Sequence, residues 1–166
     1  MITPMLLTLL ASTASAAPEM IPEDAVQVVG TTAPRVQLPT LDGGEFDLEE
    51  HRGTPVVMAF WASWCGPCRR ELPALAKYAK TRTDVHIVAV NVDRQRRAAE
   101  GFMAKTPFDL PIVWDSESVL LGQLDVVSMP TSFLIDAKGT IKWRKAGYSD
   151  AKGFVELTTA LEGLSQ

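Results

Sequence analysis

The stretch VVMAFWASWCGPCRREL, Val56–Leu72, determines the fold that we predict for this chain. It opens with six apolar residues, β-branched at the start, a run typical of a strand that is buried on both faces of a sheet. Two cysteines, Cys65 and Cys68, follow this strand, and the residues after them predict a helix over Cys65–Thr81. A strand that leads into a helix, with both cysteines at the junction, is therefore the centre of the predicted structure.

The spacing of the two cysteines favours redox chemistry. Residues three apart on a helical turn lie about 5–6 Å from each other, so Cys65 and Cys68 can form and open a disulfide without backbone movement. At the start of a helix, unpaired N–H groups and the positive end of the dipole stabilise a thiolate. We therefore expect Cys65, with a lowered pKa, to attack and the deeper Cys68 to resolve the mixed disulfide. Pro67 is tolerated there because the first turn has no partner for the N–H that proline lacks.

A structural disulfide and a metal site are the alternatives. A bridge across so short a loop gives the fold little stabilisation. Structural zinc needs four ligands, whereas this sequence has no second cysteine pair, and its two histidines, His51 and His86, stand in no ligand spacing. We therefore expect a catalytic cysteine pair, with no metal and no cofactor.

Strands and helices alternate along the rest of the chain. We expect strands at Val36–Leu38, Glu45–Leu48, His86–Val92, Ile112–Trp114, Thr131–Asp136 and Thr140–Lys145, and helices at Arg94–Lys105, Ser118–Leu124 and Asp150–Gly163. Ser149 or Asp150 can cap the last helix, and turn residues join the first two strands and the last two. This order predicts one α/β domain over residues 35–166, with a central mixed sheet flanked by helices.

The first residues have the features of a secretory signal. Ile2–Leu10 is apolar, and Ala14-Ser15-Ala16 has the pattern of a cleavage site, although no basic residue precedes Arg35. We expect a signal peptide over residues 1–16, a flexible lead over residues 17–34, and export from the cytoplasm. No stretch of the sequence reaches the roughly 18 apolar residues that a spanning helix needs, so we do not expect the mature chain to insert in a membrane.

The composition is that of an ordinary globular protein. Of the 166 residues, 46% are hydrophobic and 22% are charged, enough to build one domain with a substantial core. The formal net charge of −4 excludes the basic character typical of nucleic-acid-binding proteins. We expect a monomer with no nucleic-acid partner.

The motif Trp64-Cys65-Gly66-Pro67-Cys68 after a buried strand resembles thioredoxin, and the surrounding chain is similar to the periplasmic thioredoxin-like proteins of the TlpA/ResA/DsbE group. The matching segments are Leu38–Leu48 (LPTLDGGEFDL), Val56–Leu72, Val88–Asp93 (VAVNVD) and Met129–Asp136 (MPTSFLID). The resemblance implies a thioredoxin fold with an N-terminal β-hairpin extension and a βα-type insertion around Arg94–Ile112.

The resemblance also implies roles for residues outside the motif. It predicts a cis bond between Met129 and Pro130 that faces the cysteines, where the backbone of Met129 can pair with an extended substrate segment. Six residues before the first cysteine, thioredoxin keeps a buried aspartate, and this chain has Ala59. Glu71, three residues after Cys68, is then the candidate to handle the proton of that thiol. The residue pattern alone equally allows a carboxylate that complements the helix N-terminus.

These features predict a thiol–disulfide oxidoreductase that reduces client proteins outside the cytoplasm. Trp64, Gly66 and Pro67 surround the attacking sulfur and are expected to contact the client. By resemblance, the clients are cysteine pairs of apocytochrome c or of copper sites, and a membrane thiol-transfer protein donates the electrons. A copper chaperone that uses the same cysteines is an alternative. A thiol peroxidase is another, but that site needs a threonine where Ala62 stands.

Overall fold

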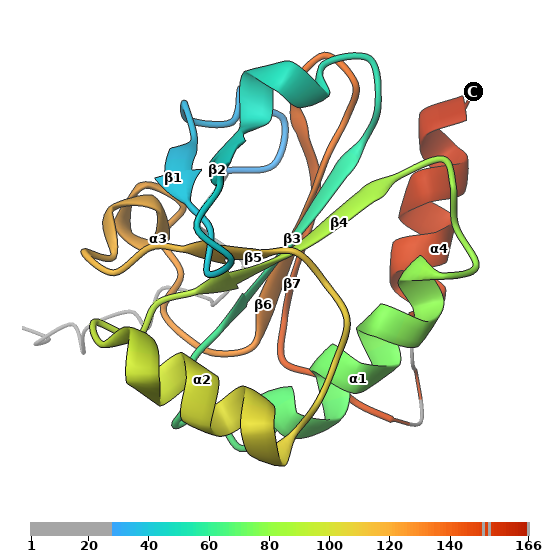
Figure 1. Ribbon diagram of the computed structural model, residues 1–166. Coiled ribbons are helices and arrows are strands. Elements are labelled where there is room, and N and C mark those ends of the chain that lie inside the picture. The colour runs from blue at the N-terminus through green and yellow to red at the C-terminus, as the bar shows by residue number, and fades with distance from the viewer. Residues whose placement is uncertain (1–27, 151, 153, 166) are drawn as a thin grey trace, which may run out of the picture.

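A five-stranded mixed sheet in the order β5-β4-β3-β6-β7 forms the centre of the computed structural model, which describes residues 28–150, 152 and 154–165 (Figure 1). The strands are β3 (Val56–Trp61), β4 (His86–Asn91), β5 (Ile112–Trp114), β6 (Thr131–Ile135) and β7 (Ile141–Ala146). β3, β4 and β5 run parallel, whereas β6 is antiparallel to both β3 and β7. The predicted mixed sheet is confirmed, with strand limits shifted by at most one residue.

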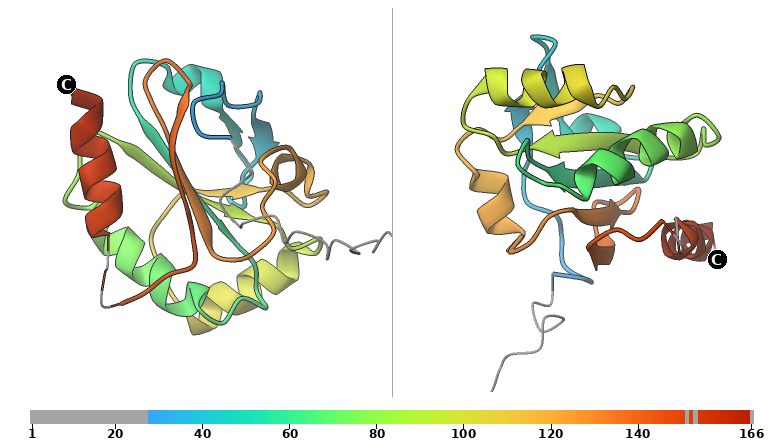
Figure 2. Two further views of the ribbon diagram at one scale, coloured as in Figure 1. Left: turned by 180° about the vertical axis from the view of Figure 1, so that it is seen from behind. Right: turned by 90° about the horizontal axis from the view of Figure 1, so that it is seen from below.

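Helices and a small hairpin cover the two faces of this sheet. The helices are α1 (Cys68–Ala79), α2 (Arg96–Lys105), α3 (Val119–Gln123) and α4 (Val155–Glu162), with 3-10 turns at Leu48–His51 and Gly163–Ser165. The predicted N-terminal hairpin is present as β1 (Gln37–Pro39) and β2 (Glu45–Asp47). The β6–β7 hairpin lies behind β3 in Figure 1 and faces the viewer in the left view of Figure 2.

The central strand β3 contributes side chains to both cores. Met58 and Phe60 are fully buried on the face covered by the hairpin and α3. Val57, Ala59 and Trp61 are fully buried on the other face, under α1, α2 and α4. Burying a large apolar side chain contributes about 1.5–3 kcal/mol, so β3 is a firm base for the loop that follows it.

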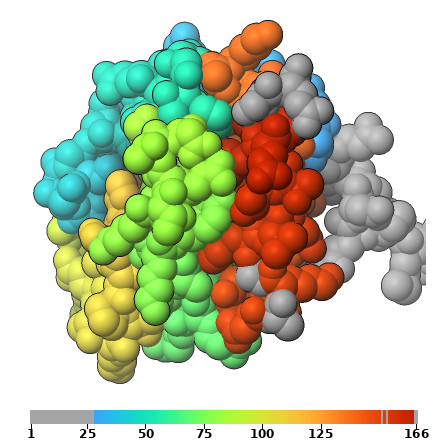
Figure 3. Space-filling model, turned by 90° about the vertical axis from the view of Figure 1, so that its right-hand side faces the viewer, coloured from blue at the N-terminus to red at the C-terminus, as the bar shows by residue number. Residues whose placement is uncertain are grey.

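The start of α4 differs from the prediction. The helix begins at Val155, and neither Ser149 nor Asp150 caps it. The carboxylate of Asp150 instead forms an ion pair of 3.0 Å with Arg70 of α1. The ring of Phe154, at the N-cap position, lies 5.2 Å from the ring of Tyr78 on α1. Contacts with α1 therefore fix where α4 begins, and α4 lies along the side of the molecule shown in Figure 3.

Part of the expected lead is tied to the domain. The N–H of Gly30 donates to the carbonyl of Ile141 at 2.7 Å, and the N–H of Ala33 donates to the carbonyl of Gly139 at 2.8 Å. Ala33 is also buried in the core. The expected signal peptide, residues 1–16, and residues 17–27 of the lead lie outside the described residues. Within the described part of the chain, every helix is too short or too polar to cross a bilayer.

Candidate active site

The two cysteines lie where β3 ends and α1 begins. They form a disulfide, with their Cα atoms 5.4 Å apart. Cys65 is 3% exposed and Cys68 is fully buried, so the second sulfur lies deeper, as the sequence predicts. Trp61 and Leu72 pack in the same core cluster as the two cysteines. The buried end of β3 and the first turns of α1 therefore hold the pair in place.

Helix α1 begins three residues later than predicted, at Cys68 rather than at Cys65. The N–H of Cys65 donates to the carbonyl of Ala62 at 3.0 Å and so belongs to the loop. The first turn is closed by the N–H of Arg69, which donates to the carbonyl of Gly66 at 3.2 Å. Pro67 occupies the N-cap position, just ahead of the first turn.

In this geometry, a backbone N–H and the positive end of the helix dipole still face the sulfur of Cys65. The N–H of Cys68, the first residue of the helix, donates to the Sγ atom of Cys65 at 3.2 Å. A hydrogen bond from a backbone N–H becomes stronger when its acceptor is charged, and the helix dipole acts in the same direction. Both interactions favour a thiolate at Cys65 over one at Cys68.

The bond between Met129 and Pro130 is cis. It precedes β6, whose first residue, Thr131, pairs with Phe60 near the end of β3. The cis bond therefore lies at the same end of the sheet as the cysteines. Pro130 is buried, and Met129 is half-buried against the core cluster that contains both cysteines.

The surface beside the cysteines is partly apolar. The side chain of Trp64 is 71% exposed, although it directly precedes the nearly buried Cys65. Gly66 and Pro67 are exposed as well. Three of the residues expected to contact a substrate thus lie on the surface around the attacking sulfur.

A buried aspartate that sequence reasoning missed holds the loop before the cysteines. The carboxylate of Asp93 accepts hydrogen bonds from the N–H and from the hydroxyl of Ser63, each at 2.8 Å. It also accepts one from the side chain of Asn91 at 2.9 Å. Asp93 is 7% exposed and follows β4, the neighbour of β3. The segment VAVNVD, which contains both residues, was recognised only as a family match.

Glu71 is buried on α1, with one long hydrogen bond. Its side chain is 4% exposed, and its Oε1 atom accepts from the hydroxyl of Ser132 at 3.4 Å. Ser132 lies on β6 and pairs with Ala59 of β3. The acid on α1 therefore reaches the part of the sheet where Ala59 replaces the buried aspartate of thioredoxin. Among the described residues, the Oε2 atom of Glu71 has no hydrogen-bond partner.

The surroundings of Glu71 favour its neutral form. Burial raises the pKa of Glu71 from 4.5 to about 7. The hydrogen bond from Ser132 and the positive charge of Lys145 oppose this rise without cancelling it. A carboxyl with a pKa near neutrality can take up and release a proton under ordinary conditions. The alternative reading, a carboxylate that only complements the helix N-terminus, does not explain the depth of burial.

The fold and the buried cysteine pair together define a thioredoxin-like redox protein. Residues 29–144 match the model of the AhpC/TSA family. The chain belongs to this family.

Curated relatives make the class more specific. The chain is 37% identical over 122 residues to the thiol-disulfide oxidoreductase ResA of Geobacillus kaustophilus (strain HTA426), which covers 72% of this chain and 70% of that protein. It is 32% identical over 124 residues to the sporulation thiol-disulfide oxidoreductase A of Bacillus subtilis (strain 168), covering 72% and 74%.

Solved structures agree with these relatives. The thiol:disulfide interchange protein DsbE from Chlorobium tepidum superposes with a TM-score of 0.76 at 31% identity, covering 83% of this chain and 98% of that one. StoA from Bacillus subtilis superposes with a TM-score of 0.65 at 29% identity, covering 76% and 97%. The chain is therefore a thiol–disulfide oxidoreductase of the ResA/DsbE type, as the resemblance predicts.

Proposed function

We propose that this protein reduces disulfides of client proteins outside the cytoplasm, with Cys65 as the attacking and Cys68 as the resolving cysteine. The observation that carries this proposal is the hydrogen bond of 3.2 Å from the N–H of Cys68 to the Sγ atom of Cys65. In the reduced protein the same N–H stabilises a thiolate at Cys65 and lowers its pKa. The thiolate is the form that attacks a disulfide.

The reaction needs two exchange steps and one proton acceptor. The Cys65 thiolate attacks one sulfur of the client disulfide, forms a mixed disulfide and releases the other client sulfur as a thiolate. Cys68 then gives up its proton and attacks Cys65, which closes the Cys65–Cys68 disulfide and releases the second client sulfur. Two electrons have passed to the client. Glu71, one turn after Cys68 on α1, accepts the proton that Cys68 gives up.

Client binding involves the exposed residues around Cys65. Trp64 offers an apolar surface beside the attacking sulfur, and Gly66 and Pro67 are exposed next to it, where a docked client can contact them. An extended client segment pairs with the backbone of Met129, which precedes β6 at the same end of the sheet. Pro130 follows Met129 through the cis bond.

The compartment and the clients are proposals that rest on the sequence and the family. The signal-like first residues support export to the periplasm. The resemblance to the TlpA/ResA/DsbE group supports cysteine pairs of apocytochrome c or of copper sites as clients, with a membrane thiol-transfer protein as electron donor. We propose that the mature protein acts as a monomer.

The reduction potential of the Cys65–Cys68 couple tests the direction of electron flow. A value near −250 mV or lower, measured by equilibration with glutathione or with a thioredoxin, supports a reductant. A value near −120 mV contradicts our proposal, because such a protein oxidises its clients.

Two cysteine variants test the assignment of roles. Cys65→Ser abolishes disulfide exchange, whereas Cys68→Ser accumulates a mixed disulfide with a model peptide that holds one disulfide. Mass spectrometry of the trapped complex identifies the attacking sulfur. Exchange activity retained by Cys65→Ser contradicts the mechanism.

Copper binding tests the alternative in which the same cysteines carry a metal. His51 and His86 lie at the other end of the sheet, because His86 pairs with Val56 at the start of β3 whereas the cysteines follow its end. Titration of the reduced protein with Cu(I) is expected to show no tight site with a histidine ligand.

The peroxidase alternative is disfavoured because Ala62, buried next to the loop, has no hydroxyl group.

A further inference from the structure

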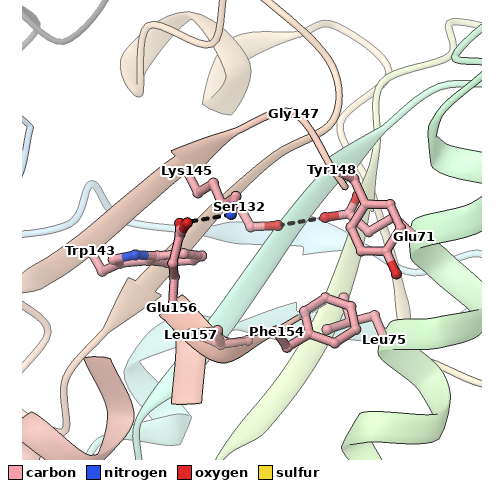
Figure 4. Close-up of a pocket in the computed structure, with 10 residues that line it drawn as sticks. All are labelled: Glu71, Leu75, Ser132, Trp143, Lys145, Gly147, Tyr148, Phe154, Glu156 and Leu157. Atoms are coloured by element: carbon pink, nitrogen blue, oxygen red, sulfur yellow. Dashed lines mark hydrogen bonds and ion pairs between the residues drawn. The ribbon is translucent and has the colours of Figure 1, made fainter. Parts of the chain in front are cut away.

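A row of polar residues crosses the sheet beneath α1 and α4. Ser132 of β6 pairs with Ala59 of β3 on one side and with Lys145 of β7 on the other. Residues paired directly across strands point to the same face of a sheet. Here this is the face on which Glu71 of α1 and Glu156 of α4 also lie (Figure 4). The row therefore leads from the buried acid of the active site to the edge of the molecule.

The lysine of this row stands between two carboxylates. The Nζ atom of Lys145 donates to the carboxylate of Glu156 at 2.7 Å. Its positive charge also acts on Glu71, whose own contact in the row is the hydroxyl of Ser132 (Figure 4). The side chain of Lys145 is 21% exposed and that of Glu156 is 45% exposed, so this ion pair is partly shielded from water.

The cavity between these groups is too small to bind a substrate side chain. The cavity has a volume of about 10 Å³, close to the room that a single water molecule needs. The charged groups that line it, Lys145 and Glu156, therefore act on Glu71 through their charges rather than through a bound ligand. Among the described residues that line this cavity, Lys145 is the sole cation.

We propose that Lys145 is a positioning residue that sets the protonation of Glu71, and that Glu156 determines how much of the Lys145 charge Glu71 experiences. This inference rests on the proposed role of Glu71 as the proton acceptor for Cys68. When Glu71 takes the proton of Cys68 it becomes neutral, and Lys145 is paired with Glu156. When Glu71 releases that proton to water, its carboxylate attracts the same ammonium group.

The other ionisable groups around the cavity do not replace Lys145 in this role. Tyr148 lines the cavity after β7, and burial, followed by the charge of Asp150, raises the pKa of its phenol above 10, so it is neutral at pH 7. Arg70 of α1 pairs with Asp150 at 3.0 Å. Lys152 lies 3.9 Å from Glu156, is 69% exposed, and does not line the cavity.

Two substitutions test the inference because they act with opposite signs. Lys145→Met keeps most of the apolar stem but removes the charge, so the pKa of Glu71 rises. Glu156→Gln removes the competing carboxylate, so the charge of Lys145 acts more strongly on Glu71 and the pKa of Glu71 falls. Because the charge of Lys145 is the smallest of the influences on Glu71, each change alters the ratio of ionised to neutral Glu71 at pH 7 by about threefold.

The direct readout is an NMR titration of the Glu71 carboxyl group in protein with ¹³C-labelled glutamate, with the signal assigned from Glu71→Gln. In each variant, the pH profile of disulfide exchange shifts in the same direction as the pKa of Glu71. Lys142→Met is the matched control, because Lys142 lies on the same strand but pairs with Asp136 at 3.5 Å, away from the cavity. It leaves the titration of Glu71 unchanged.

Opposite shifts in the two variants support the inference, and no shift, or shifts of the same sign, overturn it. If Lys145→Met does not fold, Glu156→Gln still shows the direction in which the pKa of Glu71 shifts, since this substitution preserves the size of the side chain. The titration also separates this inference from the proposed function. If Glu71→Gln exchanges disulfides at the normal rate, the role of Glu71 as proton acceptor is wrong. If Glu71→Gln exchanges disulfides slowly but neither Lys145→Met nor Glu156→Gln shifts the pKa of Glu71, only the present inference is wrong.

Discussion

Two buried carboxylates flank the cysteine loop, and their surroundings differ. Asp93 accepts three hydrogen bonds of 2.8–2.9 Å, two from Ser63 and one from Asn91. Glu71 accepts a single bond of 3.4 Å from Ser132, and its second oxygen has no partner among the described residues. The two acids are similarly buried, at 7% and 4% exposure. Their hydrogen bonds, rather than their depth, make them different.

The difference separates a structural acid from a reactive one. A buried charge that is well bonded holds its neighbours in place and resists removal. A buried carboxyl with few bonds exchanges its proton near neutral pH, because burial disfavours the charged form and little compensates for it. In our proposal, one carboxylic acid, Asp93, thus fixes the loop before Cys65, whereas the other, Glu71, accepts the proton of Cys68.

The largest effect is expected at the structural acid. Asp93→Ala leaves the loop donors of Ser63 and the amide of Asn91 unpaired, so the free energy of unfolding falls by about 3–5 kcal/mol. Urea denaturation of the oxidised protein at pH 7 measures this loss. Asp93→Asn keeps one acceptor oxygen and loses about half as much. A change below about 0.5 kcal/mol for Asp93→Ala breaks the comparison.

The pH dependence of stability is expected to come from Glu71. Its pKa is about 7 in the folded protein and close to 4.5 in the unfolded chain, so between these values the folded state binds one more proton. The stability that Glu71 contributes is therefore fully present below pH 4.5 and is lost as the pH rises through about 7, by about 3 kcal/mol.

Comparison of the wild type with Glu71→Gln isolates this contribution from that of other groups. Unfolding is measured for both proteins at pH 4.5 and at pH 8. The wild type loses about 3 kcal/mol relative to the variant between these two conditions. Parallel curves would show that Glu71 has an ordinary pKa.

The catalytic effect of Glu71→Gln is expected to be next in size. The variant cannot accept the proton of Cys68, so disulfide exchange at pH 7 slows about 100-fold, which corresponds to about 2.7 kcal/mol. Stopped-flow kinetics with a disulfide peptide measures the rate. Glu49→Gln is the control, since Glu49 pairs with Arg52 on the surface at the other end of β3. A rate within twofold of the wild type argues for a purely structural Glu71.

The smallest effect is expected for Ser132→Ala. This variant removes the one hydrogen bond that Glu71 accepts, and the distance of 3.4 Å marks that bond as weak. We expect a loss of about 0.5 kcal/mol in stability at pH 8, where Glu71 is ionised, and a smaller loss at pH 5. Thermal unfolding at both pH values measures the difference. An equal loss at both values would show that Ser132 does not act on the charged form.

Much of the fold was predictable because its strongest signals are local. The apolar run of β3 and the cysteines that follow it are contiguous in the sequence, so one stretch contains both the strand and the site. The cis bond before Pro130 came from the family resemblance, and the structure confirms it. The one-residue shifts of strand ends reflect hydrogen bonding between strands, which no single stretch reveals.

The features that were missed depend on contacts between distant residues. Ser63 and Asp93 are 30 residues apart and meet because the ends of β3 and β4 lie side by side. The predicted start of α4 relied on Ser149 or Asp150 as a cap. Asp150 instead pairs with Arg70, 80 residues earlier in the chain, and α4 begins at Val155. A polar pair such as Asn91 and Asp93 at the end of a buried strand is the signal that points to such a cluster.

The near-complete burial of both sulfurs has a consequence for selectivity in a mixture of thiols. With Cys65 3% exposed and Cys68 fully covered, a small free thiol finds almost no sulfur surface to approach in the oxidised protein. In our proposal, a protein that docks on the exposed Trp64 reaches the sulfur by displacing the side chains that cover it, which a freely diffusing thiol does not do. The fold thus protects the Cys65–Cys68 disulfide against reduction by small thiols and limits its reduction to partners large enough to bind.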